Sequence, residues 1–180
     1  AYNWANGQTN PTATNLLAGT YTPTITDANG CIDTILVTIT EPTVLVSSII
    51  NSQNINCNGN STGSISTSTI GGTGTYTFFW SNGQTTANLQ NIAAGTYTLS
   101  ATDLSGCVST ITETITESTA LGIQLTPTDI DCNGNVNGSI SAVTSGGTGT
   151  YTYVWSSGQK VSMIDNLQSG NYTVSITDSL

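Results

Sequence analysis

Residues able to carry out chemistry are few in this 180-residue chain. It has ten acidic residues, one basic residue (Lys160), four cysteines and no histidine. Without histidine, neither a Ser–His nor a Cys–His nucleophile can form. Two carboxylates could in principle serve a glycosidase, but the acidic residues sit near turns and joints and mark no cleft. We therefore expect no catalytic residue, no cofactor and no enzymatic activity.

The net charge of −9 limits the partners of the chain. Binding to nucleic acid needs clustered Lys and Arg, and docking on an anionic membrane needs the same basic residues. The sequence also lacks a run of about eighteen apolar residues, so no segment is expected to insert into a membrane. Nucleic acids and lipid bilayers are therefore excluded as expected partners.

The sequence repeats itself with a period of about 75 residues. A Trp-x-x-Gly-Gln motif begins at Trp4, Trp80 and Trp155, which lie 76 and 75 residues apart. A glycine follows each Trp after fifteen residues, and two residues later comes a tyrosine: Tyr21, Tyr97 and Tyr172. So many matched positions indicate tandem repeats.

The repeat divides the chain into three units. Residues 1–41 are the C-terminal part of one repeat, 42–117 form a complete repeat, and 118–180 form a repeat that lacks its last strand. Because the chain opens in mid-pattern, we expect it to be a piece of a longer protein. The joints are short, which leaves little freedom between successive units.

Strand-like segments make up each unit. In the complete repeat, residues 64–70, 76–80, 96–102 and 108–116 alternate between polar and apolar side chains and are separated by Gly- and Asn-rich turns. Short strands at this spacing predict an all-β fold with a sandwich of roughly seven strands per unit. We expect tandem immunoglobulin-like β-sandwiches, of the PKD or fibronectin-III type.

Aromatic side chains have two interpretations. Tyr76, Phe78 and Trp80 share one face of a strand because side chains alternate with a period of two. They could stack on sugars, but a thin sandwich needs large apolar areas in its core. We therefore predict core positions for the repeated aromatic residues, and an exposed face for Phe79 and Val154. The predicted core aromatics are Trp4, Trp80, Trp155, Tyr21, Tyr97 and Tyr172.

One stretch is similar to the start of a calcium-binding loop. Residues 129–134 follow the order D-x-D-x-N-G, but the Glu expected at the twelfth place is replaced by Ile140. The equivalent residues of the middle unit, 54–59, have Asn in place of both aspartates. An Asx-rich turn explains the stretch better, and we predict no metal site.

Several motifs recur together and identify a family resemblance. They are Cys-Asn-Gly, Gly-Gly-Thr-Gly-Thr-Tyr, Trp-Ser-Asn-Gly-Gln-Thr-Thr, Ala-Gly-Thr-Tyr-Thr and Thr-Asp-x-x-Gly-Cys. The series resembles the SprB-type repeat of gliding-motility adhesins in Bacteroidetes and covers the whole chain. The resemblance implies a very long secreted surface protein, exported by the type IX system and moved along the cell exterior.

Two functions are consistent with these observations. The first is a structural stalk or filament of an extracellular cell-surface adhesin, in which the partners are neighbouring repeats or other copies of the chain. The second is a module that binds surface polysaccharide through exposed aromatic or loop residues. The burial of the face that carries Trp80 distinguishes between them.

The four cysteines are expected to form disulfides in a secreted protein, since no His and no C-x-x-C pair is present for a zinc site. Cys57 could pair with Cys107 inside one repeat. Alternatively, two pairs could cross the joints: Cys31 with Cys57, and Cys107 with Cys132. Immunoglobulin topology separates Cys57 from Cys107 by about 20 Å, beyond the reach of a disulfide. The cross-joint pairs are favoured, and the other pairing stays open.

Two segments resemble the Asp-Ser/Thr-hydrophobic acceptor of O-glycans in Bacteroidetes. They are residues 33–35 and 178–180. The resemblance makes Thr34 and Ser179 candidate glycosylation sites.

Overall fold

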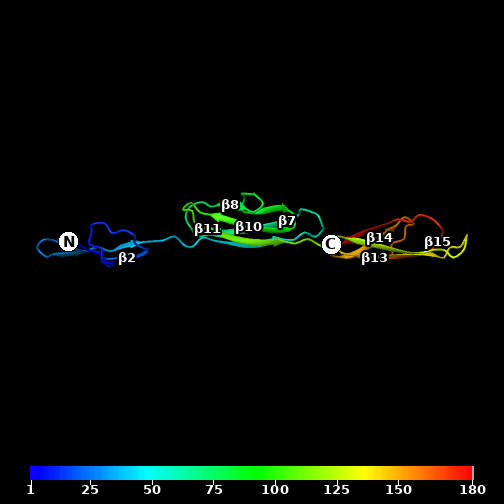
Figure 1. Ribbon diagram of the computed structural model, residues 1–180, viewed down its shortest axis with the longest axis horizontal. Coiled ribbons are helices and arrows are strands. Elements are labelled where there is room, and N and C mark those ends of the chain that lie inside the picture. Colours follow the sequence, from blue (N-terminus) through cyan, green and yellow to red (C-terminus); the bar gives the residue numbers. More distant parts are fainter. Residues whose placement is uncertain (180) are drawn as a thin grey trace.

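The computed structural model describes residues 1–179. These residues form sixteen β-strands and no helix, and the strands fall into three units that follow one another in a row (Figure 1). The expected all-β fold of tandem sandwich repeats is therefore confirmed. Among residues 1–179 there is no helix of the length and apolar character needed to cross a bilayer.

The middle unit is a sandwich of two three-stranded sheets. One sheet has the order β6 (Val46–Gln53), β7 (Gly63–Ile70), β9 (Leu89–Ile92). The other has the order β11 (Val108–Ile115), β10 (Gly95–Thr102), β8 (Thr77–Trp80). Neighbouring strands in both sheets are antiparallel. The unit has six strands rather than about seven, and between β6 and β7 only Ile55 takes part in a bridge.

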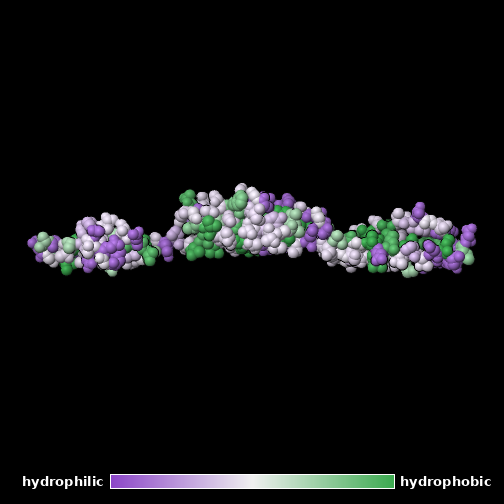
Figure 2. All heavy atoms as spheres, viewed as in Figure 1, coloured by the Kyte–Doolittle hydropathy of each residue, from purple (hydrophilic) through white to green (hydrophobic). Residues whose placement is uncertain are grey.

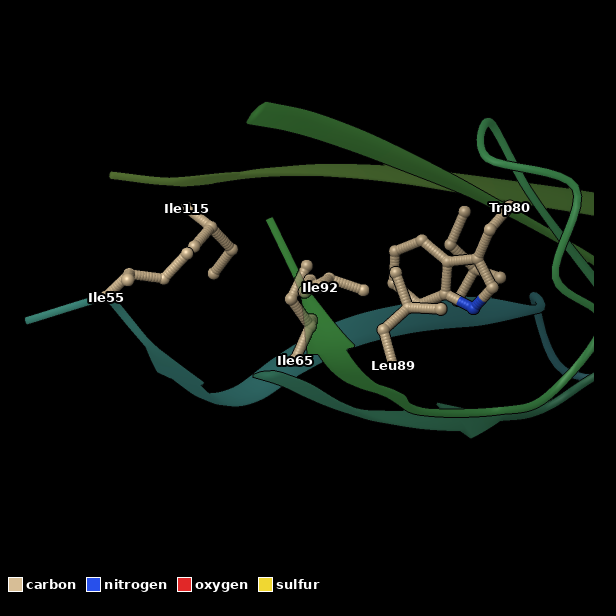
Figure 3. Close-up of a cluster of buried hydrophobic side chains, with 7 residues drawn as sticks. Ile55, Ile65, Trp80, Leu89, Ile92 and Ile115 are labelled. Atoms are coloured by element: carbon tan, nitrogen blue, oxygen red, sulfur yellow. The ribbon is translucent and has the colours of Figure 1, made fainter. Parts of the chain in front are cut away.

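Alternation along these strands builds the core of the middle unit. Side chains at every second position of β7, β8 and β10 point between the sheets. There they meet apolar residues from β9, from β11 and from the segment after β6 (Figure 3). The buried cluster consists of Ile55, Ile65, Trp80, Leu89, Ile92, Leu99 and Ile115.

The first and last strands of the middle unit close the sandwich on one side. Beyond the end of β6, Ile55 forms a parallel bridge with Glu117. The backbone N–H of Ile55 donates to the carbonyl of Thr116 at 2.9 Å, and the N–H of Ser118 donates to the carbonyl of Ile55 at 3.2 Å. The chain therefore enters the unit at one end and leaves it at the other.

The first unit contains only the later strands of the pattern. They are β1 (Tyr2–Asn3), β2 (Gly19–Tyr21), β3 (Thr24–Thr26), β4 (Ile32–Thr34) and β5 (Val37–Ile39), in sheets β1-β3-β4 and β2-β5. Gly19 pairs with Ile39 as Gly95 pairs with Ile115 in the middle unit. Since residues 1–41 include no counterpart of β6 or β7, Pro23 is the one buried residue among them.

The third unit contains the earlier strands. β12 (Gly122–Thr128), β13 (Gly138–Ser145) and β15 (Met163–Leu167) form one sheet, and β14 (Thr150–Trp155) pairs with β16 (Val174–Ser179). Its core is smaller and consists of Ala142, Trp155, Ile164 and Leu167. The part of the chain that the structure describes contains no counterpart of β11 in this unit.

A cavity marks the position that a last strand occupies in the middle unit. In the third unit, a cavity of about 260 Å³ is lined by Ile130, Gly138 and Tyr172, among others. In the middle unit, a Cβ added to Gly63, the counterpart of Gly138, would lie 2.8 Å from the side chain of Ile115. The residue that fills this space in the complete unit therefore comes from β11.

Candidate functional site

Trp80 and Trp155 occupy the centres of the middle and third units. Trp80 and Trp155 are 0% and 2% exposed. Trp4 is half-buried, because residues 1–41 contain no counterparts of β6 and β7 to cover it. In all three units the indole N–H donates to a carbonyl six residues further along, at 2.8–2.9 Å: Asn10, Thr86 and Val161. The following loop thus satisfies the polar group of each ring, and the rings of Trp80 and Trp155 also have their apolar body in the core.

Each repeated tyrosine fixes the turn before it through a hydrogen bond. Tyr21, Tyr97 and Tyr172 are half-buried. Each hydroxyl donates to the carbonyl four residues earlier, at 2.9–3.0 Å: Leu17, Ala93 and Gln168. The shared geometry explains why the Gly-x-Tyr motif recurs in every unit, and it makes these residues part of the scaffold.

The strand face with Trp80 points inward. Tyr76 and Phe78 are partly buried, and their rings meet edge to face with centroids 6.4 Å apart. The opposite face of the same strands is open, with Phe79 60% and Val154 49% exposed. No row of aromatic rings is therefore presented to solvent by the described residues of β8 and β14.

A carboxylate links two motifs that are thirty residues apart in the sequence. Asp103 accepts hydrogen bonds from the backbone N–H groups of Thr73, Ser105 and Cys107 at 2.8–2.9 Å. These bonds, that from Thr73 foremost, hold the pKa of the Asp103 carboxyl below its usual value. The turn before β11 is thereby fastened to the loop between β7 and β8.

Glycines make this contact sterically feasible. Gly72 has a φ of 63°, and a Cβ there would lie 2.5 Å from Oδ2 of Asp103. The third unit repeats the arrangement: Asp178 accepts from the N–H groups of Thr148 and Gly149, both at 2.7 Å. Sequence reasoning missed this role, although the recurrence of Asp27, Asp103 and Asp178 at the repeat interval was a usable signal.

The joint between the middle and third units is held from both sides. The Glu117 carboxylate accepts the backbone N–H of Gly59 at 2.7 Å, and the side chain of Asn58 donates to the carbonyl of Ser118 at 3.0 Å. On the other side, the N–H of Gly147 donates to the carbonyl of Thr119 at 3.0 Å. A cleft of about 390 Å³ remains between residues 56–58 and 176–178.

Exposed apolar side chains gather at the opposite end of the middle unit, beside the first unit (Figure 2). They belong to the segment before β6, the end of β7 and the β10–β11 turn. Val44, Ile70, Leu104 and Val108 are 59–80% exposed. The surface of the unit is therefore most apolar at an end, where the neighbouring unit of the chain lies.

The expected disulfides are not present. All four cysteines are free and exposed: Cys31, Cys57, Cys107 and Cys132. Cys107 precedes β11, and Cys57 lies beyond β6 next to residue 118, so about eight residues of strand, roughly 26 Å, separate them. The cross-joint pairs required β11 and β12 to fold back on each other as a hairpin. Instead, β12 pairs with β13 and carries Cys132 away from the joint.

The calcium-like stretch is a closed turn. The Asp131 carboxylate accepts the side-chain N–H of Asn135 at 2.6 Å, and this bond is the main cause of a lowered pKa of Asp131. The backbone N–H of Asn135 also donates to the carbonyl of Cys132 at 3.1 Å. Within residues 1–179 no three acidic, Cys or His side chains are grouped as a metal site would need.

The two candidate glycosylation sites differ in their surroundings. Thr34 is exposed at the end of β4. The hydroxyl of Ser179 lies 2.7 Å from that of Thr150 and donates to the carbonyl of Thr150 at 2.9 Å. Leu180, which completes the second motif, lies outside the described residues. Of the two hydroxyls, that of Thr34 is the better placed to accept a glycan.

Comparison with known families finds one match. Residues 49–85 and 125–160 match the SprB repeat. Both segments begin within the first strand of a unit and end in the turn after the tryptophan strand, and they start 76 residues apart. No curated protein matches the chain with significant similarity. The SprB repeat is typical of secreted cell-surface proteins. One segment of the middle unit and one segment of the third unit are therefore similar to the SprB repeat.

Proposed function

We propose that these residues form a stalk or filament region of a secreted bacterial cell-surface adhesin. The observation that carries the proposal is the path of the chain through the complete unit. The first and last strands run in the same direction, so each unit passes the chain onward to the next (Figure 1). An array of such units gains length with every added repeat.

The joint supports a spacer role. Residues 117–119 are hydrogen-bonded to the middle unit through Gly59 and to the third unit through Gly147. A link held on both sides restricts bending more than a free linker of the same length. The array is therefore expected to hold an adhesive end at a distance from the cell.

The finer assignments follow from the family. We place the protein outside the cell, with export by the type IX system and a connection to gliding motility. Its partners are its own neighbouring repeats or other copies of the chain. We assign it no catalytic activity, because it has no histidine and its repeated carboxylates act as acceptors for backbone N–H groups.

One observation favours a second function. Phe79 is 60% exposed on the outer face of β8, and an exposed ring can stack on a sugar. A polysaccharide-binding module is the alternative that this residue supports. The burial of Trp80 and Trp155 counts against it, because the largest rings are withheld from the surface.

The spacer role is tested by changing the number of units. A chain in which residues 42–117 are duplicated should show a larger maximum dimension in small-angle X-ray scattering, by the length of one unit. A compact particle with little increase would contradict the proposal. Sedimentation with cell-surface polysaccharide tests the alternative, which requires binding that is lost on Phe79→Ala and kept on Val154→Ala.

A further inference from the structure

In the complete unit, hydrogen bonds connect the first and last strands and the residues that follow them. β6 and β11 belong to different sheets, yet they are bonded to each other at both ends of the sandwich. At one end the backbone N–H of Ser47 donates to the hydroxyl oxygen of Ser109 at 2.9 Å. At the other, backbone bonds join Ile55 to Thr116 and Ser118.

Side chains add to this seam between the two strands. The side-chain oxygen of Asn54 accepts the N–H of Thr116 at 2.9 Å. The hydroxyl of Ser52 donates to the Glu113 carboxylate at 2.6 Å. Bonds to a carboxylate are about twice as strong as those between neutral groups. We name the seam, formed by residues 47–59 and 109–118, the β6–β11 clamp.

The direction of the strands decides how tension acts on the clamp. β6 is joined to the preceding unit at its N-terminal end, and β11 is joined to the next unit at its C-terminal end. Tension along the array therefore pulls the two parallel strands past each other. The bonds between them are loaded together and in shear, whereas a force that opened one end would break them in turn.

We propose that the β6–β11 clamp is a force-bearing element, which sets the resistance of each complete unit to unfolding under tension. The biological role of the clamp rests on the proposed stalk function. The mechanical resistance itself is a property of the fold, so each proposal can fail without the other.

The units at the two ends of the chain lack this element. The first unit has no counterpart of β6, and the described residues of the third have no counterpart of β11. Stretching the whole chain from its termini should therefore give one high-force event. That event should release the 76 residues of the middle unit, up to about 27 nm of chain.

Two matched substitutions test the clamp at the level of one bond. Asn54 and Asn88 are both exposed, and each side-chain oxygen accepts one backbone N–H, at 2.9 and 2.8 Å. Asn54 lies in the clamp, and Asn88 joins the β9 side to β7. At constant force, Asn54→Ala should raise the unfolding rate about five-fold, the factor for one hydrogen bond. Asn88→Ala should leave that rate unchanged.

The attachment points provide a test that alters no clamp residue. All four cysteines are first replaced by serine, and handles are then attached through Val44→Cys with Thr119→Cys, or through Val44→Cys with Leu104→Cys. The first pair loads the clamp in shear. Val44 and Leu104 lie at the same end, since Val44 contacts Gly71 and the N–H of Leu104 donates to Thr73. This second pair should unfold the unit at lower force.

Equal forces for the two attachment pairs, or equal acceleration by Asn54→Ala and Asn88→Ala, would overturn the clamp. Neither result would test the stalk proposal. That proposal is tested by small-angle X-ray scattering of the chain with a duplicated unit, which applies no tension. Conversely, a compact duplicated chain would refute the stalk and leave the force measurement valid.

Discussion

The indole of Trp80 fills the centre of the middle unit, and the loop that follows satisfies its N–H. Asp103 works in the same way at the end of the sandwich, where its carboxylate accepts three backbone N–H groups. At the scale of single residues, one repeated position therefore buries apolar area, and another satisfies backbone N–H groups. Both roles can be measured.

The first residue-scale prediction concerns the core. Trp80→Ala should destabilise the middle unit by about 3–5 kcal/mol, because it empties a fully buried aromatic site. Trp4→Ala should lower the stability much less, since Trp4 is only half-buried in a unit that has no counterparts of β6 and β7. Urea unfolding followed by circular dichroism gives both values. Similar small losses for the two variants would place Trp80 outside the stabilising core.

The second residue-scale prediction concerns pH. The pKa of folded Asp103 lies below the ordinary aspartate value of 3.8, so its stabilising effect is complete above about 3.8. The effect is lost as the pH falls through the folded-state pKa, because the protonated acid is a poorer acceptor. Melting temperatures between pH 7 and pH 2 should therefore fall less steeply for Asp103→Asn than for the unaltered chain.

Asp165→Asn provides the charge control for that measurement. It removes one negative charge, and the Asp165 carboxylate accepts a hydrogen bond from the side chain of the neighbouring Asn166 instead of from a distant backbone segment. An acid profile of Asp103→Asn that matches this control would show that the bonds to Thr73 and Cys107 do not contribute.

At the scale of elements, loops and strand ends are held by contacts between distant segments. The Gly-Gly-Thr loop after β7 meets Asp103 at the end of β10, and the segment after β6 meets the end of β11. Strands alone leave the ends of a sandwich open. These contacts close both ends, and glycine is required where the backbone comes closest.

The element-scale prediction separates backbone strain from steric overlap. Gly83 has a φ of 85° and nothing within 4 Å of an added Cβ, so Gly83→Ala should cost about 1–2 kcal/mol from left-handed strain alone. Gly72→Ala should cost clearly more, because its Cβ would also lie 2.5 Å from the Asp103 carboxylate. Thermal unfolding of the two variants supplies the comparison, and equal losses would count against the overlap.

At the scale of the whole molecule, the units are joined end to end, and the cysteines lie at unit ends without meeting. Cys107 is near the first unit, Cys57 is at the joint with the third unit, and all four thiols are exposed. The units are therefore joined by the backbone and by the hydrogen bonds at the joints, with no disulfide between units among residues 1–179.

The whole-molecule prediction is a thiol count. Titration of the folded chain with a thiol reagent should detect all four cysteines, and unfolding should not increase the number. The expected pairs across the joints would instead lower the count to zero under non-reducing conditions. Peptide mapping with an Asp- or Glu-directed protease would then identify any pair that had formed.

The sequence by itself determined the period, the three units, the all-β fold and the resemblance to the SprB repeat. These features depend on local patterns, since alternation and turn residues define strands, and matched motifs define repeats. The inward position of Trp80 and the outward position of Phe79 followed from the same alternation. No contact between distant segments was needed to derive them.

The tertiary structure alone decided which distant segments meet. Gly72 lies against Asp103, β6 runs beside β11, and Cys57 is far from Cys107, although nothing in the local pattern distinguishes these arrangements from others. The number of strands and the absence of the expected disulfides also depend on which distant segments meet. A strand pattern specifies which face is buried, whereas the partner of each edge depends on how the two sheets pack around one core.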